Sequence, residues 1–294
     1  MEQYEEYIRK ATVLIEALPY IQKFRGAVVV VKFGGSAMED RDCVESALRD
    51  IVFMEIVGMK PVIVHGGGKE ISTQLEASEI GTRFIHGLRY TCAETIRVVD
   101  SVMHRDINPR LVASIEKYGG RASGLSGKEI LTATPMTTTD EATGEAVDLG
   151  YVGEVTDVDA GRISAIVELD VVPVITPLGT GSDGKPYNIN ADIAACRIAE
   201  ALRARKLVFL SDVPGILADP EDERSLISTV RMNDVDRLFD EKIISGGMLP
   251  KITSAVAALN AGTNKVHLVD GRIQHSLLLE IFTDKGVGTE IVKG

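Results

Sequence analysis

The sequence predicts an α/β fold in which an open, mostly parallel sheet is sandwiched between helices. Short apolar runs, such as the four valines at 28–31, alternate with segments of helical periodicity. Such runs are typical of strands that are buried on both faces of a sheet. At 294 residues, with 45% hydrophobic and 26% charged residues, the chain is long enough to bury a substantial core.

The elements follow one another along the chain. Residues 3–18 carry apolar side chains at helical spacing, and Pro19 is expected to end this helix. We expect the helix to pack either on its own domain or on another subunit. The remaining predicted elements are a strand at 27–33, a helix at 41–57, a strand at 60–65, helices at 69–78 and about 91–118, a strand-rich region at 130–156 with a hairpin turn near 139–145, alternating elements at 163–170 and 171–177, a helix at 192–204, a strand with its turn at 206–215, a helix at 251–262, a strand at 265–270 and a helix at 276–284.

A glycine- and proline-rich segment at 177–188 predicts a boundary between two lobes. We therefore expect an N-terminal helix at 1–25, an N-lobe at 26–180 and a C-lobe at 181–294.

Charge and cysteine content exclude several classes of protein. The net charge is −11 and no run of Lys or Arg stands out, which argues against a nucleic-acid partner. The three cysteines show no metal-ligand spacing and predict free thiols, with no metal site. An acidic N-terminus without an apolar segment, and no apolar run near 20 residues, predict a cytoplasmic protein with no membrane association.

Two predicted strands end in glycine-rich turns that open helices, "KFGGS" at 32–36 and "HGGGKE" at 65–70. Glycine lets backbone N–H groups approach a ligand closely, and a helix N-terminus favours an anion, so each turn suits a phosphate or carboxylate. The sequence lacks a P-loop and a GxGxxG dinucleotide motif. "HRD" at 104–106 is followed by no DFG, which excludes a protein-kinase site.

Three later segments carry polar groups at the ends of predicted elements. "NINAD" at 188–192 begins a helix and is compatible with a simple N-cap. "LSDVPGI" at 210–216 ends a strand and suits a nucleoside. In "ISGGMLPKI" at 244–252, Lys251 stands at a helix start, where a cation opposes the helix dipole unless an anion lies beside it.

In this order, the motifs resemble the amino-acid kinase family. "HGLRYT" at 86–91 and "DLGYVGEVTDVD" at 148–159 are similar to the branch that acts on N-acetyl-L-glutamate. The resemblance implies transfer of the γ-phosphoryl group of MgATP to the side-chain carboxylate of that substrate, in arginine biosynthesis. It places amino-acid binding and dimerisation in the N-lobe and ATP in the C-lobe. Such a carboxylate is already ionised at pH 7, so positioning and electrostatics, without a general base, would carry the reaction.

The resemblance also implies roles for individual residues. Lys32 and Lys251 would flank the migrating phosphoryl group, while Asp192 would orient both lysines. Backbone N–H groups of the glycines would line the path of the phosphoryl group. Arg89 would bind the substrate α-carboxylate, with Asn188 assisting through its amide. The positions are Lys32, Asp192 and Lys251 for catalysis, Gly34 and Gly35 for the phosphoryl group, Gly66, Gly67, Arg89 and Asn188 for substrate, and Ser211, Asp212, Gly215, Ile216, Gly246, Gly247 and Met248 for ATP.

The N-terminal extension, which ends in "YIQKFRG" at 20–26, is similar to that of family members that form hexamers, as trimers of dimers, and are inhibited by arginine. By motif position, Tyr20, His267, Glu280 and Gly286 would surround the arginine effector. A carboxylate such as that of Glu280 is a suitable partner for a guanidinium group.

Three alternatives remain open. A kinase for N-acetyl-aminoadipate differs by one methylene, which discriminates substrates by only about 1–3 kcal/mol. A non-catalytic amino-acid sensor of the same fold would be expected to have lost Lys32, Asp192 or Lys251, and all three are present. A nicotinamide oxidoreductase is disfavoured by the missing GxGxxG motif.

Overall fold

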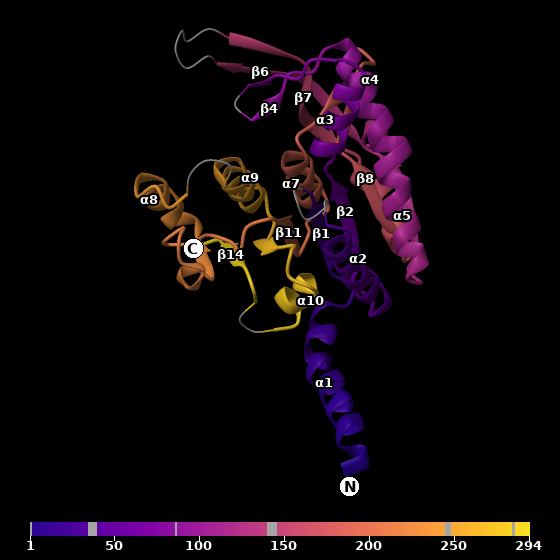
Figure 1. Cartoon of the computed structure of the whole chain (residues 1–294), viewed down its shortest axis with the longest axis vertical. Helices are drawn as coiled ribbons and strands as arrows, with labels where there is room; N and C mark the ends of the chain where they lie inside the picture. Colours follow the sequence, from indigo (N-terminus) through magenta and orange to yellow (C-terminus); the bar gives the residue numbers. More distant parts are fainter. Residues whose placement is uncertain (1, 35–39, 86, 140–145, 245–247, 284–285) are drawn as a thin grey trace.

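The computed structural model describes residues 2–34, 40–85, 87–139, 146–244, 248–283 and 286–294 (Figure 1). A central sheet of eight strands runs through both halves of the chain. In spatial order its strands are β12 (Thr229–Arg231), β14 (Thr289–Val292), β13 (Lys265–Asp270), β11 (Lys206–Ser211), β1 (Val28–Phe33), β2 (Lys60–His65), β8 (Val172–Thr176) and β5 (Ala122–Ser126).

Six of these strands, from β13 to β5, pair in parallel, and β14 joins β13 in antiparallel fashion. This arrangement confirms the predicted α/β class. The sheet passes without a break from β1 to β11, across the boundary expected at 177–188. That segment itself contributes two short strands, so the division into two lobes stays a prediction.

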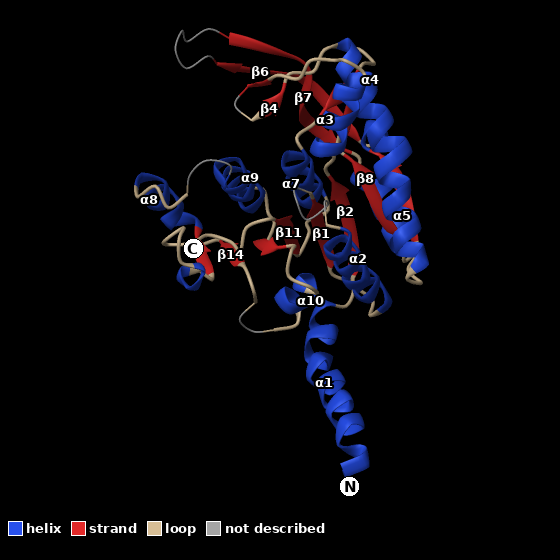
Figure 2. Cartoon of the chain, in the orientation of Figure 1, coloured by secondary structure: helices blue, strands red, loops and turns tan. Residues whose placement is uncertain are grey.

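Helices cover both faces of the sheet, as Figure 2 shows. On one face lie α6 (Ala160–Glu168), α7 (Ala191–Ala201), α8 (Val235–Asp240) and α9 (Leu249–Asn260). On the other face lie α2 (Arg41–Ile56), α3 (Gly68–Ala77), α4 (Ala93–Ser101), α5 (Asn108–Lys117) and α10 (Ser276–Ile281). Successive residues of β1 alternate between these two apolar clusters, with Val30 on the α7 face and Val29 on the α2 face.

A smaller sheet closes on itself at the edge of the molecule. Its strands are β6 (Leu131–Thr139), β7 (Ala146–Val158), β9 (Leu178–Gly181) and β10 (Pro186–Asn188). β6 and β7 pair in antiparallel fashion, with Thr139 opposite Ala146, so the predicted hairpin is present. Residues 140–145 of its turn lie outside the described residues. Two strands of two residues each, β3 (Phe84–Ile85) and β4 (Leu88–Arg89), pair in antiparallel fashion nearby. Short 3-10 turns in the described part of the chain include η3 (Gly127–Glu129), η4 (Glu223–Ser225) and η5 (Met232–Asp234).

The first helix contradicts the prediction that Pro19 ends it. α1 spans Glu2–Phe24 with Pro19 inside, and it extends away from the body of the molecule (Figure 1). Proline removes one hydrogen bond to the residue four positions earlier, here the exposed Ile15, whose side chain is 68% accessible. The next turn is anchored by Phe24, which is 4% accessible. Packing of that turn therefore offsets the local cost of proline.

The long helix predicted over about 91–118 is present but not uniform. Between α4 and α5, residues Val102–Ile107 form a π-helical segment, η2. Such segments are rare and shift the side chains that follow them around the helix axis. Sequence periodicity over this region did not predict the shift.

Candidate active site

The predicted catalytic residues meet at the carboxyl edge of the parallel strands. Lys32 is the fifth residue of β1, and its alternation with Val30 directs it toward α7. Asp192 lies in the first turn of α7, and its carboxylate contacts the Lys32 ammonium at 2.9 Å. Lys251, in the first turn of α9, approaches the other oxygen of Asp192 at 3.9 Å. One carboxylate thus bridges two lysines from different elements.

The local sequence explains why Asp192 is available for this contact. Asn190 is the N-cap of α7, and its side-chain oxygen accepts hydrogen bonds from the N–H groups of Asp192 and Ile193 at 2.8 and 3.2 Å. The N-cap expected in "NINAD" is therefore Asn190, which leaves the Asp192 carboxylate for the lysines. Asp192 also balances the unfavourable position of Lys251 at a helix N-terminus.

The two glycine turns lie against each other beside Lys32. A Cβ on Gly34 would stand 2.7 Å from the Lys32 ammonium, so only glycine leaves room for the lysine in this position. The N–H of Gly66 donates to the carbonyl of Phe33 at 2.7 Å, which joins the second turn to the first. The Gly66 N–H is thus already bonded in this structure, and its place along the phosphoryl path stays a prediction. Gly35 lies outside the described residues.

Arg89, on β4, is placed as a carboxylate ligand would be. It is 8% accessible, its Nη2 donates to the carbonyl of Gly68 and to Ser72 Oγ at 3.0 and 2.7 Å, and it stacks over Phe84. Its Nη1 is buried, and no acceptor in the described part of the chain contacts it. Burial lowers the pKa of Arg89, but arginine remains charged in proteins. A buried charged donor without an acceptor is suited to an incoming anion.

Asn188 lies on the same side of the site, linked to Arg89 through Thr91. The Asn188 amide donates to Thr91 Oγ1 at 3.3 Å, and that hydroxyl donates to the Arg89 carbonyl at 2.8 Å. The two predicted substrate ligands therefore share one buried threonine.

Four of the residues predicted for ATP, at 211–216, lie at or just after the carboxyl end of β11. Ser211 is buried there, and Asp212 is exposed. Gly215 has a φ of +142° and lies close to Thr289, whose hydroxyl accepts a hydrogen bond from the Ile216 N–H at 2.8 Å. The Ile216 side chain is fully buried in the core, so this residue shapes the turn from within. Met248 directly precedes α9, whereas residues 246–247 lie outside the described residues.

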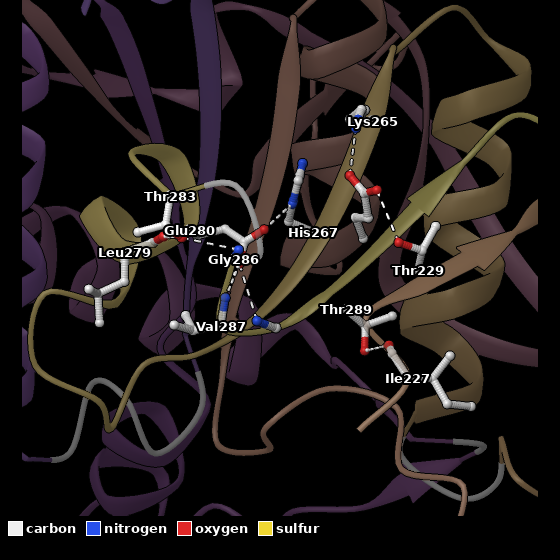
Figure 3. Close-up of polar contacts among 12 residues, drawn as sticks. Ile227, Thr229, Lys265, His267, Leu279, Glu280, Thr283, Gly286, Val287 and Thr289 are labelled. Carbon is white, nitrogen blue, oxygen red and sulfur yellow. Dashed lines mark hydrogen bonds and ion pairs between the residues drawn. The ribbon is translucent and has the colours of Figure 1, made fainter. Parts of the chain in front are cut away.

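A polar cavity of about 680 Å³ lies at the other end of the same sheet, where β11 and β13 begin. All four residues predicted for an arginine effector line it: Tyr20, His267, Glu280 and Gly286. His267 Nδ1 is bonded to one Glu280 oxygen (Figure 3), at 2.5 Å. The other Glu280 oxygen accepts hydrogen bonds from the N–H groups of Val287 and Gly288, at 2.8 and 3.1 Å. Gly286 has a φ of +62°, and a Cβ there would stand 2.6 Å from Glu280.

These contacts fix the charges of the pair. Burial disfavours ionisation of Glu280, but the bonds from His267 and from the Val287 N–H outweigh it and lower the pKa of Glu280. Burial lowers the pKa of His267, and its bond to Glu280 only partly opposes this effect. A neutral His267 thus donates to an ionised Glu280.

Lys206 is a cavity residue that sequence reasoning missed. It begins β11, lines the cavity and is 8% accessible. Burial lowers its pKa to about 8. A lysine at the start of an apolar strand was a signal in the sequence, but it equally describes a strand that begins at the protein surface.

Three further findings concern the described residues as a whole. Within these ranges, no three His, Cys, Asp or Glu side chains converge as they would around a metal ion. No described helix is long and apolar enough to cross a membrane. Cys43, Cys92 and Cys196 are free thiols, as predicted.

The fold and this arrangement of motifs define a class of protein. The profile of the Amino acid kinase family matches residues 27–270, and the chain belongs to that family. Within it, the chain is similar over nearly its whole length to proteins named acetylglutamate kinase. It is 47% identical to that of Carboxydothermus hydrogenoformans (97% of this chain, 98% of the relative) and 45% identical to that of Heliobacterium modesticaldum (97% and 99%).

Solved structures extend the comparison. N-acetylglutamate synthase from Neisseria gonorrhoeae, complexed with coenzyme A and N-acetyl-glutamate, superposes with a TM-score of 0.83 at 26% identity over 97% of this chain. The same synthase complexed with coenzyme A and L-arginine gives a TM-score of 0.79 at 26% identity over 95% of this chain. This chain spans 63% and 64% of the length of those synthase chains, so it corresponds to one part of the synthase.

Proposed function

We propose that the protein transfers the γ-phosphoryl group of ATP to the side-chain carboxylate of N-acetyl-L-glutamate, yielding N-acetyl-L-glutamyl 5-phosphate and ADP in arginine biosynthesis. The bridge that Asp192 makes between Lys32 and Lys251 carries the proposal, because it sets two cations at one point of the sheet edge. The similarity to acetylglutamate kinases over 97% of the chain identifies the acceptor.

The reaction needs charge compensation more than proton transfer. A carboxylate oxygen attacks the γ-phosphorus, the bond from that phosphorus to the bridging oxygen breaks, and ADP leaves with the electron pair. The acceptor has a reference pKa of about 4.3 and is ionised at pH 7, so no base is required. Two anions must nevertheless approach each other, and Lys32 and Lys251 would neutralise the charge that develops on the migrating group. ATP would enter as its magnesium complex.

The other residues would position the two substrates. Arg89 would use its free Nη1 to bind the α-carboxylate, with Asn188 beside it. Gly34 and Gly67 would supply backbone donors to the phosphoryl group, together with Gly35. The nucleotide would lie at 211–216 and along the loop at 246–248.

The decisive assay is ADP release, coupled to NADH oxidation, with four acceptors offered side by side: N-acetylglutamate, N-acetyl-aminoadipate, glutamate and aspartate. We expect the first to give the largest kcat/KM. Faster turnover of N-acetyl-aminoadipate would transfer the proposal to that substrate. Absence of turnover with every acceptor would indicate an amino-acid sensor, a role that the intact set of Lys32, Asp192 and Lys251 disfavours.

We further propose that L-arginine inhibits the enzyme by binding in the cavity around Glu280. The cavity contains cations, including Lys206, and acids, so it is suited to a zwitterion that carries an additional guanidinium group. The related synthase was solved in complex with L-arginine. Unchanged activity and unchanged saturation curves at millimolar arginine would contradict this part of the proposal.

The N-terminal helix supports a homo-oligomer, which we propose is a hexamer built as a trimer of dimers. Tyr4, Tyr7, Ile8, Leu14 and Ile15 of α1 are between 61% and 68% accessible, although they form an apolar stripe. A stripe of this size on a projecting helix is typical of a subunit contact. A cytoplasmic location is consistent with the three free thiols.

A further inference from the structure

A buried chain of hydrogen bonds holds the second glycine turn from below. His65, the last residue of β2, faces the α5 side of the sheet and is fully buried. Its Nδ1 lies 2.8 Å from the carbonyl of Gly66, and its Nε2 lies 3.2 Å from the side-chain amide nitrogen of Asn108. That same nitrogen donates to the carbonyl of Val174, on β8, at 2.8 Å.

The groups at the two ends of this series of hydrogen bonds determine the position of every proton within it. Both ends, at Val174 and Gly66, are carbonyl oxygens, which can only accept. The Asn108 amide nitrogen must therefore face Val174 and donate its second hydrogen to His65 Nε2. His65 Nε2 is then an acceptor, so the imidazole proton resides on Nδ1 and is donated to Gly66. Burial lowers the pKa of His65 to about 4, consistent with this neutral form.

The hydrogen bond from His65 to the Gly66 carbonyl also fixes the direction of the Gly67 N–H. The Gly66 carbonyl and the Gly67 N–H belong to the same peptide unit, which is trans, so they point in opposite directions. A carbonyl held toward the buried imidazole therefore directs the Gly67 N–H away from it. The Gly66 N–H is held separately by Phe33. In the described part of the chain, no acceptor is bonded to the Gly67 N–H.

The π-helical segment η2 brings two neighbouring side chains to this turn. Ile107 ends the segment, and its Cδ1 would lie 2.6 Å from a Cβ on Gly67. Asn108 follows directly and reaches His65. Gly124 leaves room for the Asn108 amide, since a Cβ there would stand 2.2 Å from Oδ1. The π-helical segment thus places Ile107 against Gly67 and Asn108 against the His65 imidazole, which is bonded to Gly66.

We propose that His65 and Asn108 are positioning residues that orient the Gly66–Gly67 peptide, so that the Gly67 N–H faces the transferring phosphoryl group. The positioning role rests on the proposed phosphoryl transfer, because only in that reaction would the Gly67 N–H stabilise the phosphoryl group in the transition state. His65 takes no part in proton transfer, since both of its nitrogens are occupied within the core.

The test uses two substitutions that each retain half of the imidazole. In His65→Asn, the amide nitrogen takes the position of Nδ1 and can donate to Gly66. In His65→Gln, the longer side chain takes the position of Nε2 and leaves Gly66 without a donor. His65→Asn removes more volume than His65→Gln, so loss of packing alone would harm the asparagine variant more, which is the reverse of the order expected here.

We expect His65→Gln to lower kcat by about tenfold or more, with KM for ATP and for the acceptor within about threefold of wild type, because a misplaced donor weakens mainly the transition state. His65→Asn should retain several-fold more of the wild-type kcat. Asn108→Leu should resemble His65→Gln. Equal losses in the two His65 variants, or losses confined to KM, would overturn the positioning role.

A spectroscopic measurement separates this inference from the proposed activity. Long-range 1H–15N correlation spectra of the full-length, 15N-histidine-labelled protein report the tautomer of each imidazole, and the signal absent from His65→Asn identifies His65. We expect a neutral Nδ1–H form at pH 7 in the wild type. An Nε2–H form would overturn the inference even if the enzyme is active. An inactive wild type with the Nδ1–H form would refute the proposed function while leaving the hydrogen-bond chain confirmed.

Discussion

Replacement of Asp192 by asparagine tests the bridge between the two lysines most directly. The change keeps the shape of the side chain and removes its charge. Lys32 Nζ lies 2.9 Å and Lys251 Nζ 3.9 Å from the carboxylate oxygens, and all three side chains are at most 24% accessible. Asparagine would leave two ammonium groups facing a neutral amide.

The distances set the scale of the effect. With an effective dielectric constant of about 20, the two contacts correspond to about 6 and 4 kcal/mol of Coulomb attraction. Desolvation of the charges cancels part of this attraction, and loss of one partner from a buried ion pair costs about 3–5 kcal/mol. If the lysines must hold their positions for phosphoryl transfer, a loss of that size corresponds to a fall in kcat of about 10²- to 10⁴-fold.

The assay is steady-state ADP release with both substrates saturating, accompanied by thermal unfolding of each variant. Glu200→Gln is the matched control, because Glu200 lies on the same helix and its partly exposed carboxylate pairs only with Arg197 among the described residues. The control should retain wild-type kcat. A folded Asp192→Asn enzyme with kcat within threefold of wild type would refute the role assigned to the bridge.

Four further outcomes are expected. Arg89→Lys should raise KM for N-acetylglutamate about tenfold or more with a smaller change in kcat, since one ammonium cannot replace a guanidinium whose Nη2 bonds Gly68 and Ser72 while its Nη1 stays free for the carboxylate; an unchanged KM would exclude Arg89 as the carboxylate ligand. In the folded protein the pKa of His65 is about 4, whereas in the unfolded chain it is about 6.5, so the unfolded chain binds a proton more readily. The free energy of unfolding is therefore unaffected by His65 above pH 6.5 and decreases as the pH falls toward 4. At pH 5 the loss is about 2 kcal/mol, and urea unfolding at pH 7.5 and 5 should show it in the wild type but not in His65→Asn; equal losses would contradict the assignment. Glu280→Gln should raise the arginine concentration for half-inhibition at least tenfold while kcat stays near wild type, and an unaltered inhibition curve would argue against the cavity around Glu280. Replacement of Ile8 and Ile15 by aspartate should lower the molecular mass measured by light scattering, whereas an unchanged mass would show that the apolar stripe of α1 is not a subunit contact.

The meeting of Lys32, Asp192 and Lys251 could be predicted from the sequence, because the family resemblance groups them and each lies near the end or the start of a predicted element. Their catalytic role stays a prediction. Lys32 is the last residue but one of a buried strand, and "NINAD" begins a helix that the parallel topology brings to the same edge. Their meeting with Lys251 required only that the carboxyl ends of parallel strands share one side of the sheet.

Other features depend on contacts between distant segments and could not be predicted in this way. The Gly66 N–H is bonded because Phe33 lies opposite it, and α1 continues beyond Pro19 because Phe24 is buried against the body of the protein. The π-helical segment at 102–107 has ordinary helical composition, and only its packing against the glycine turn distinguishes it. Local propensity carries no information about such contacts.

The position of β11 has a practical consequence for any mutational study of this enzyme. Its first residue, Lys206, lines the cavity around Glu280, and its last, Ser211, stands at the proposed nucleotide site. At about 3.3 Å per residue, the five steps between them span about 17 Å of a single buried strand. A substitution at Val208 or Phe209, midway along it, is therefore expected to disturb the proposed inhibitor site and the proposed nucleotide site together. Variants in this strand would not separate the proposed inhibition from catalysis, whereas variants at Glu280 would.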